Sequence, residues 1–271
     1  MRSPLGGVTV RHMRKTLPCG LLAIALAAWI VAHPAMAEQT GVQTGEQTAQ
    51  ATVRWSGRTW IVRDSTGGPG PNTFSPRNVE ARQDETLHLF LRPTNGHWSC
   101  AELYTTESLG RGTYEFELVS RVDRFDPNVV LGLFSYPDAE VGPDGTNELD
   151  IEFARWGHAD WPNGNYTAYP RQPGGKDVSC TFEFKQPTGR DSTIQRYTWQ
   201  RLAIRFETLV PVAGQAPSLT KQWTTPGRFA SQVARKAMPV HLNLWLFNGK
   251  PPADRRPVEV VIRAFRFTPE K

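Results

Sequence analysis

The chain has 271 residues, which is long for one average domain but normal for a single all-β sandwich. Hydrophobic residues make up 39% of it and charged residues 21%, so intrinsic disorder is not the default expectation. The 31 basic and 26 acidic side chains give a net charge of +5, but residues 1–37 hold four of the basic and none of the acidic ones, which leaves +1 for the rest. This balance, without any RNA- or DNA-binding motif, excludes an overall basic field that would attract nucleic acid.

Residues 1–37 have the features of an export signal. A basic stretch ending in Arg14 and Lys15 precedes the apolar run 21–32, and residues 35–37 (Ala-Met-Ala) have the small-x-small form of a cleavage site. The apolar run is shorter than the roughly 20 residues that span a bilayer, and a retained membrane anchor is the alternative. We expect a cleaved signal peptide and a secreted or periplasmic protein without stable membrane insertion.

The remainder divides into a tether and a folded domain. Residues 38–52 form a degenerate Gln-Thr-Gly repeat without an apolar face, which predicts a disordered linker. Residues 53–271 alternate short runs of β-branched and aromatic residues with Gly, Pro, Asn and Asp clusters, and no window shows the period of a long amphipathic helix. This pattern predicts an all-β domain of two stacked antiparallel sheets. The expected strands are 53–62, 77–82, 86–92, 99–105, 113–122, 129–136, 148–154, 165–169, 178–184, 198–206, 239–247 and 257–267.

Two cysteines, Cys100 and Cys180, follow the signal segment, and both lie in strand-like runs. In an oxidising compartment they could form one disulfide or remain two buried thiols, and the sequence leaves both possibilities open. No cysteine or histidine spacing resembles a zinc or redox site. We expect neither a metal ligand set nor an organic cofactor, although the sequence does not show whether calcium binds the outer sheet.

The segment 147–153, Asn-Glu-Leu-Asp-Ile-Glu-Phe, places three carboxyl groups at alternate positions. In a strand, Glu148, Asp150 and Glu152 project to one face and the apolar residues between them to the other. Carboxyl groups this close repel one another, and proton uptake relieves the repulsion. Glycoside hydrolysis with retention uses one ionised and one protonated carboxyl about 5–5.5 Å apart. The Cα atoms of Glu148 and Glu152 are roughly 13 Å apart in a strand, so both side chains must lean inward. An acidic solvent-facing strand is the simpler alternative.

The run 148–153 resembles the active-site signature Glu-x-Asp-x-Glu of glycoside hydrolase family 16, in the form found in its lichenase and xyloglucan-active branch. That family has a concanavalin-like β-jelly roll with a concave substrate cleft and cleaves or transfers β-glucans with retention. Residues 112–117 look like the family's Gly-x-Tyr-Glu-x-Arg strand. Residues 130–136 are similar to the strand before the catalytic one, and residues 238–245 to a late strand ending in Asn-Leu-Trp.

The resemblance implies that Glu148 is the nucleophile and Glu152 the acid/base, with Asp150 between them to orient the nucleophile. Glu117 stands where the family has an Arg, and Thr146 where lichenases have an aromatic residue, and both departures concern the substrate more than the chemistry. Rings of the site could instead belong to the core, and Trp156 and Trp161 could form a packed loop. The substrate-binding residues implied are Glu115, Phe134, Tyr136, Trp156, Asn243 and Trp245.

Together these features predict an exported, monomeric, retaining endo-β-glycanase that hydrolyses β-glucan, with β-1,3/1,4-linked glucan as the expected polysaccharide. Two alternatives remain. A transglycosylase would pass the same covalent intermediate to a sugar hydroxyl of β-glucan or xyloglucan. A non-catalytic carbohydrate-binding sandwich would keep the binding face but has no need of three crowded carboxyl groups.

Overall fold

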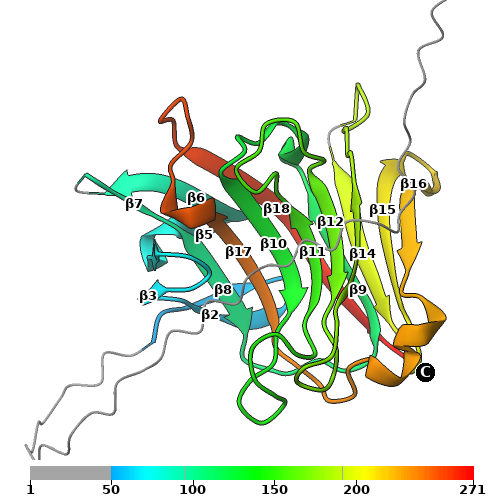
Figure 1. The fold of residues 1–271 in the computed structure, drawn as a ribbon. Coiled ribbons are helices and arrows are strands. Elements are labelled where there is room, and N and C mark those ends of the chain that lie inside the picture. Colours follow the sequence, from blue (N-terminus) through cyan, green and yellow to red (C-terminus); the bar gives the residue numbers. More distant parts are fainter. Residues whose placement is uncertain (1–49, 95, 191) are drawn as a thin grey trace, which may run out of the picture.

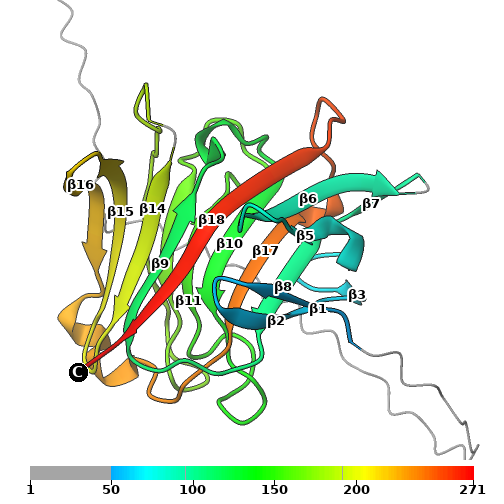
Figure 2. The same ribbon diagram turned by 180° about the vertical axis from the view of Figure 1, so that it is seen from behind.

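The computed structural model describes residues 50–94, 96–190 and 192–271. The predicted signal segment and nearly all of the predicted tether lie outside these residues, and the first strand begins at Thr52. The described chain forms two large antiparallel sheets that lie one in front of the other (Figure 1), with β18 and β9 of the second sheet nearest the viewer when seen from behind (Figure 2). The expected all-β sandwich of two antiparallel sheets is therefore confirmed.

The first sheet has the strand order β1-β2-β8-β17-β10-β11-β12-β13. The second has the order β16-β15-β14-β9-β18-β6-β5, with β7 added to β6, and β3 pairs with β4 separately. The first sheet contains β1 (Thr52–Trp55), β2 (Arg58–Val62), β8 (Ala101–Thr105), β10 (Val129–Ser135), β11 (Leu149–Phe153), β12 (Gly164–Ala168), β13 (Val178–Phe182) and β17 (Val240–Leu246). The other strands are β3 (Ser65–Gly67), β4 (Asn72–Phe74), β5 (Val79–Ala81), β6 (Leu87–Thr94), β7 (His97–Ser99), β9 (Gly112–Leu118), β14 (Thr193–Trp199), β15 (Ile204–Val212), β16 (Gln215–Thr224) and β18 (Val258–Pro269).

The helices of the described residues are short 3-10 segments: η1 (Pro76–Asn78), η2 (Val122–Arg124), η3 (Gly227–Gln232) and η4 (Phe247–Gly249). None of them is long and apolar enough to cross a membrane.

The core lies between the two sheets, and hydrogen bonds between buried hydroxyl groups cross it. From the first sheet, Ser135 shares a 2.7 Å hydrogen bond with Tyr197, and Tyr166 shares one of 2.7 Å with Thr208 of the second sheet. Thr208 in turn donates to Gln195 Oε1 at 2.7 Å. Because these polar groups are buried, each needs a partner, and the pairs join the two sheets across an otherwise apolar layer.

Several predicted strands are wrong in their bounds: residues 77–82 begin in η1 and continue into β5, and residues 113–122 run past the end of β9 into η2. Residues 53–62 form a hairpin, since Ser56 and Gly57 adopt positive φ angles of 49° and 72° and turn the chain between β1 and β2. Residues 198–206 contain a turn closed by the Gln200 N–H to the Ala203 carbonyl at 2.9 Å, so they span the end of β14 and the start of β15. The edge strand β16 was not predicted because it is largely exposed and polar, without the apolar alternation of a half-buried strand.

Cys100 is a buried free thiol, so the disulfide with Cys180 that the sequence left open does not form. Its Sγ donates to Asn72 Oδ1 at 3.4 Å. Burial raises the pKa of this thiol to about 12, which keeps it protonated and unreactive.

The buried hydroxyl pairs yield a prediction about stability. Tyr166→Phe removes the partner of Thr208 in the core and should lower the free energy of unfolding by about 1 kcal/mol, measured by urea denaturation. Tyr104→Phe is the matched control, because its hydroxyl bonds only the exposed Gln50 amide at 3.1 Å, and it should change stability by less than about 0.5 kcal/mol. Equal losses in the two variants would contradict a special role for the buried pair.

Candidate active site

The alternation of β11 sets the geometry of the acidic segment. Leu149, Ile151 and Phe153 are at most 1% exposed and fill the core. Asp150 and Glu152 therefore project from the opposite side of the first sheet, which points away from the second sheet and is called the open face below. Glu148 directly precedes β11, and its carbonyl accepts a hydrogen bond from the N–H of Tyr169 at 2.9 Å. The structure thus brings the three predicted carboxyl groups to one face.

Burial and nearby negative charges raise the pKa of all three carboxyl groups. Burial, followed by the charge of Glu148, raises the pKa of Glu152 to about 8. Burial raises the pKa of Glu148 to about 7, with contributions from Asp144 and Glu102, while a hydrogen bond from Asp150 acts in the opposite direction. The pKa of Asp150 is raised well above its usual range by burial and then by the charges of Glu148 and Glu152. The hydrogen bond between Asp150 and Glu148 lowers the pKa of Glu148 and raises that of Asp150, which favours the proton on Asp150.

The strands on either side of β11 place polar groups beside the carboxyls. In the β11–β12 pair, Asn165 lies opposite Glu152. Its amide is fixed at both ends, since Nδ2 donates to the Ala154 carbonyl at 3.2 Å and Oδ1 accepts from Thr181 Oγ1 at 3.1 Å. On β10, Gly132 lies opposite both Glu152 and Asn243. A side chain at Gly132 would meet Asn243 Oδ1 at 2.5 Å, so glycine is what lets Asn243 lie over β10.

The open face of β17 carries unpaired hydrogen-bonding atoms. Asn243 Oδ1 and Trp245 Nε1 are buried and have no hydrogen-bond partner in the described part of the chain. Buried polar atoms are normally paired, so two unpaired atoms on one strand are an exception within the described residues. Both residues were predicted to bind substrate, and both lie on the face that carries the carboxyls.

The two predicted aromatic residues of the preceding strand also reach the open face. Phe134 lies opposite Asp150 and is 8% exposed, so it belongs to this face and not to the core between the sheets. The ring of Tyr136 stands nearly perpendicular to it, at 6.0 Å between centroids. The Tyr136 hydroxyl donates to Asp144 Oδ1 at 2.6 Å and thereby ties down the loop that leads into β11.

The two tryptophans that follow β11 differ in their surroundings. Trp156 has a positive φ of 53° and packs against Trp245 at 6.3 Å and Phe247 at 5.8 Å between ring centroids. Trp156 is only 6% exposed, so it supports Trp245 from the side. Trp161 stacks instead on His158 at 3.9 Å in the loop.

The prediction that Glu115 binds substrate is wrong. Glu115 lies on β9 in the second sheet, where its Oε1 accepts from Arg196 Nε at 2.9 Å and Nη2 at 2.6 Å. The buried neighbours Tyr114 and Phe116 occupy the core positions of this strand, so Glu115 must face outward on the far side of the molecule. Glu117 shares that outer face and pairs with Arg263 at 2.6 Å, so it is not a departure within the site.

Several open-face residues were missed by the sequence reasoning. Glu102 and Tyr104 of β8 lie opposite Asn243 and His241 of β17. Tyr169 lies near the acidic strand, since burial and then the charges of Asp150, Glu148 and Glu152 raise its pKa. The alternation of polar and apolar residues from Ala101 to Tyr104 was a usable signal for β8. Nothing in the sequence, however, indicated that β8 would neighbour β17.

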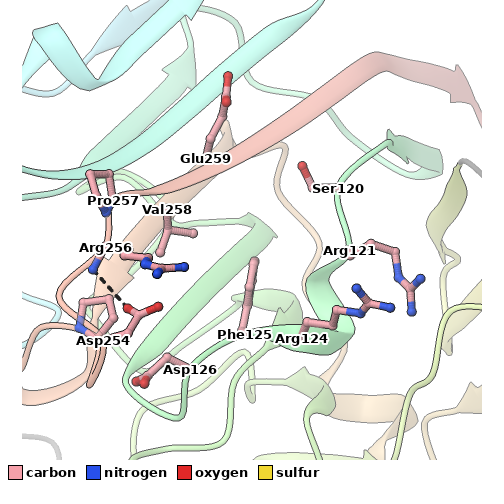
Figure 3. Close-up of a pocket in the computed structure, with 11 residues that line it drawn as sticks. Ser120, Arg121, Arg124, Phe125, Asp126, Asp254, Arg256, Pro257, Val258 and Glu259 are labelled. Atoms are coloured by element: carbon pink, nitrogen blue, oxygen red, sulfur yellow. Dashed lines mark hydrogen bonds between the residues drawn. The ribbon is translucent and has the colours of Figure 1, made fainter.

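A separate cavity of about 350 Å³ lies between η2 and the segment that leads into β18 (Figure 3). None of the predicted site residues lines it. Its basic side chains, Arg121, Arg124 and Arg256, are balanced by nearby acidic groups. The Asp126 carboxylate already accepts from two backbone N–H groups at 2.9 Å, including that of Ala253. This cavity therefore has no excess of basic over acidic lining side chains.

Comparisons with known proteins agree on the fold. No family model and no curated protein sequence matches the chain. Among solved structures, the β-glucanase of Bacillus licheniformis is 21% identical and covers 84% of this chain and 100% of its own, with a TM-score of 0.57. The laminarinase catalytic domain of Thermotoga maritima is 16% identical, covering 78% of this chain and 92% of its own, with a TM-score of 0.58.

A third neighbour, Rv0315 of Mycobacterium tuberculosis, is described as an immunostimulatory antigen and pseudo β-1,3-glucanase. It is 17% identical and covers 78% of this chain and 91% of its own, with a TM-score of 0.57. At such identities the likeness concerns the fold. The chain has the jelly-roll sandwich of the β-glucanases of glycoside hydrolase family 16.

Proposed function

We propose that the protein is a retaining endo-β-glycanase, exported after removal of residues 1–37, with β-1,3/1,4-linked glucan as its substrate. The observation that carries this proposal is the placement of three carboxyl groups on one open face of the first sheet, with no basic side chain among the causes of their raised pKa values. Glu148 accepts a hydrogen bond that favours its ionised form, while burial and the Glu148 charge keep Glu152 protonated. One carboxylate and one carboxylic acid are the pair that retaining hydrolysis needs.

In the first step, Glu148 attacks the anomeric carbon and Glu152 gives its proton to the departing glycosidic oxygen. The bond from the anomeric carbon to the leaving sugar breaks as the ester bond to Glu148 forms. The hydrogen bond from protonated Asp150 holds the attacking carboxylate and becomes weaker as its charge is lost. Asp150 thus orients the nucleophile without leaving the protonated state.

The second step needs Glu152 as a base, and the same electrostatics supports this change. The charge of Glu148 is one cause of the high pKa of Glu152. Once Glu148 is esterified that charge is gone, so the pKa of Glu152 falls. Glu152 then removes a proton from water, the water oxygen bonds to the anomeric carbon, and the ester to Glu148 breaks. Two displacements at the same carbon retain its configuration.

The preference for a β-glucan has separate support. Asn243 and Trp245 lie on the face that carries the carboxyls, and an amide beside an indole ring suits a sugar ligand. The acidic signature has the uninterrupted spacing of the lichenase branch. The β-glucanase and laminarinase folds named above match over more than three quarters of this chain.

A non-catalytic glycan-binding protein is the second candidate, favoured by the pseudo β-1,3-glucanase that shares this fold. Binding alone does not require three buried carboxyl groups without a basic partner, because their burial costs free energy. Transfer to a sugar acceptor, the third possibility, uses the same intermediate. Added oligosaccharide acceptors that lengthen the products would identify it.

The catalytic assignment is tested with paired Glu→Gln substitutions. Glu148→Gln should abolish the release of reducing ends from β-glucan, and Glu152→Gln should lower kcat by about 10²–10⁴-fold. Glu115→Gln is the matched control, since Glu115 lies on the opposite side of the molecule, and its activity should equal that of the native protein. Proton NMR of the first products should show the β-anomer. Glucan binding without reducing ends in the native protein would instead support the non-catalytic candidate.

Activity should depend on pH as a bell. It should rise as Glu148 ionises around pH 7 and fall as Glu152 loses its proton around pH 8, because only the form with Glu148 ionised and Glu152 protonated is active. The profile of kcat/KM against pH, measured with soluble glucan, checks this. If the residual activity of Glu152→Gln still fell around pH 8, Glu152 would not be the group whose loss of a proton causes this fall.

Stability should also respond to the buried acids. Glu152 binds its proton with a pKa of about 8 in the folded state against 4.5 as the ordinary value, so the folded state holds more protons between these limits. The free energy of unfolding therefore falls as pH rises through this window. Glu152→Gln removes the effect and should raise the unfolding temperature near pH 8 above that of the native protein. Near pH 4, where Glu152 is protonated in both states, the two proteins should melt alike. If Glu152→Gln were less stable than the native protein near pH 8, the raised pKa of Glu152 would be contradicted.

A further inference from the structure

A charged cluster on the open face lies beyond the predicted catalytic strand. Glu102 of β8 has both carboxylate oxygens engaged: Oε1 with Nδ1 of His241 at 3.1 Å, and Oε2 with Nη1 of Arg63 at 2.7 Å. Arg63 is itself fixed, because its Nε donates to Ser65 Oγ at 2.8 Å and its guanidinium lies 3.9 Å from the centre of the Phe74 ring. The cluster joins segments that are far apart in the sequence, and apart from the contribution of the Glu102 charge to the pKa of Glu148 it takes no part in the reaction described above.

The carboxylate of Glu102 determines the role of one nitrogen of the histidine ring. Burial raises the pKa of Glu102, but the hydrogen bonds and charges of His241 and Arg63 together lower it below the usual value. An ionised carboxylate only accepts hydrogen bonds, so Nδ1 of His241 carries the proton toward Glu102. The other ring nitrogen, Nε2, is then an acceptor when the ring is neutral and a donor when it is protonated. A sugar hydroxyl group can donate to the neutral ring or accept from the protonated ring.

The ring of His241 is held between aromatic neighbours. It stacks on Tyr104 with 4.8 Å between ring centres and planes 13° apart, and the Phe134 ring lies 5.2 Å away on the other side. Tyr104 and Phe134 lie on the two strands that flank β17. The three rings come from neighbouring strands and stack side by side across the sheet. Their planes therefore stand roughly perpendicular to the sheet, and the ring edges point toward the solvent.

Nε2 lies on such an edge. Within the part of the chain that the structure describes, Nε2 has no hydrogen-bond partner. It is nevertheless not sealed from solvent. The His241 side chain is 12% exposed. The ring therefore has one nitrogen fixed by the protein and one left available.

The position of His241 relates it to the carboxyls. His241 lies opposite Phe134 on β10, and Phe134 lies opposite Asp150 on β11. Two strand spacings put His241 about 10 Å from the acidic strand. Along β17, His241 is followed at alternate positions by Asn243 and Trp245, each with an unpaired polar atom. A polymer that extends from the carboxyls across β10 would meet this row.

We propose that His241 binds a hydroxyl group of a glucan residue next to those at the carboxyls, and that Glu102 and Arg63 are its positioning residues. This inference rests on the proposed function, because the ligand is the same β-glucan. Nε2 makes the contact, and the Glu102 carboxylate fixes the ring so that no free energy is spent in ordering it on binding.

Substitution by two amides separates the roles of the two ring nitrogens. An Asn side chain reaches about as far as Nδ1 and can keep the bond to Glu102, whereas a Gln side chain reaches about as far as Nε2. His241→Asn should raise KM for soluble β-glucan by about 10-fold with kcat within about 2-fold, the pattern of lost substrate binding. His241→Gln should recover part of the loss. Glu102→Gln should raise KM in the same direction. His97→Asn, an exposed histidine on β7, is the matched control and should behave as the native protein.

Substrate length and a catalytically inactive background complete the test. A short aryl glycoside that occupies only the region of the carboxyls should be cleaved equally by the native protein and His241→Asn. In the Glu148→Gln background, affinity electrophoresis in β-glucan should show weaker retardation after His241→Asn than after His241→Gln.

The possible failures are distinct. A native protein that neither binds nor cleaves any β-glucan would overturn the proposed function, and this inference with it. A native protein that is active while His241→Asn keeps its KM, or loses kcat equally on short and long substrates, would overturn this inference alone. Thermal unfolding of each variant identifies any loss that reflects misfolding, and His241→Gln then serves as the second variant.

Discussion

The burial of three carboxyl groups without a basic partner is the constraint on which the candidate site depends. Leu149, Ile151 and Phe153 anchor β11 in the core and thereby force the acidic residues onto the open face. Proton uptake is the relief available to them, since no basic side chain contributes to their shifted pKa values in the described chain. Because Asp150 holds a proton next to Glu148, one glutamate can be an anion while the other remains an acid. Core packing and acid–base chemistry are thus two consequences of the same alternation.

The two faces of the first sheet treat polar groups differently. On the inner face, the hydroxyls of Ser135 and Tyr166 are paired with partners in the second sheet, as a buried interior requires. On the open face, Asn243 Oδ1 and Trp245 Nε1 have no partner among the described residues. The paired groups between the sheets stabilise the fold, whereas the open face carries the candidate site.

The outer face of the second sheet shows how a motif can mislead. The residues around Glu115 match a family strand, yet Tyr114 and Phe116 occupy the core and turn Glu115 toward Arg196. The glutamate that does lie on the open face is Glu102, one strand earlier in the chain. Glu102 was passed over because its partners, Arg63 and His241, come from segments with no visible relation to it. The edge strand β16 was missed for a different reason, since an exposed strand needs no apolar alternation to pair along one side.

The sequence by itself determined what depends on neighbouring residues. Alternation in residues 148–153 determined that the three carboxyls share a face, and the spacing of turn residues determined an all-β fold. Only the tertiary structure decided which strands neighbour one another and which sheet each joins. Glu102 and His241 are separated by 139 positions, and their contact exists because β8 and β17 pair. A strand's period is set by its own backbone, whereas its neighbours are selected by packing over the whole domain, which no local pattern records.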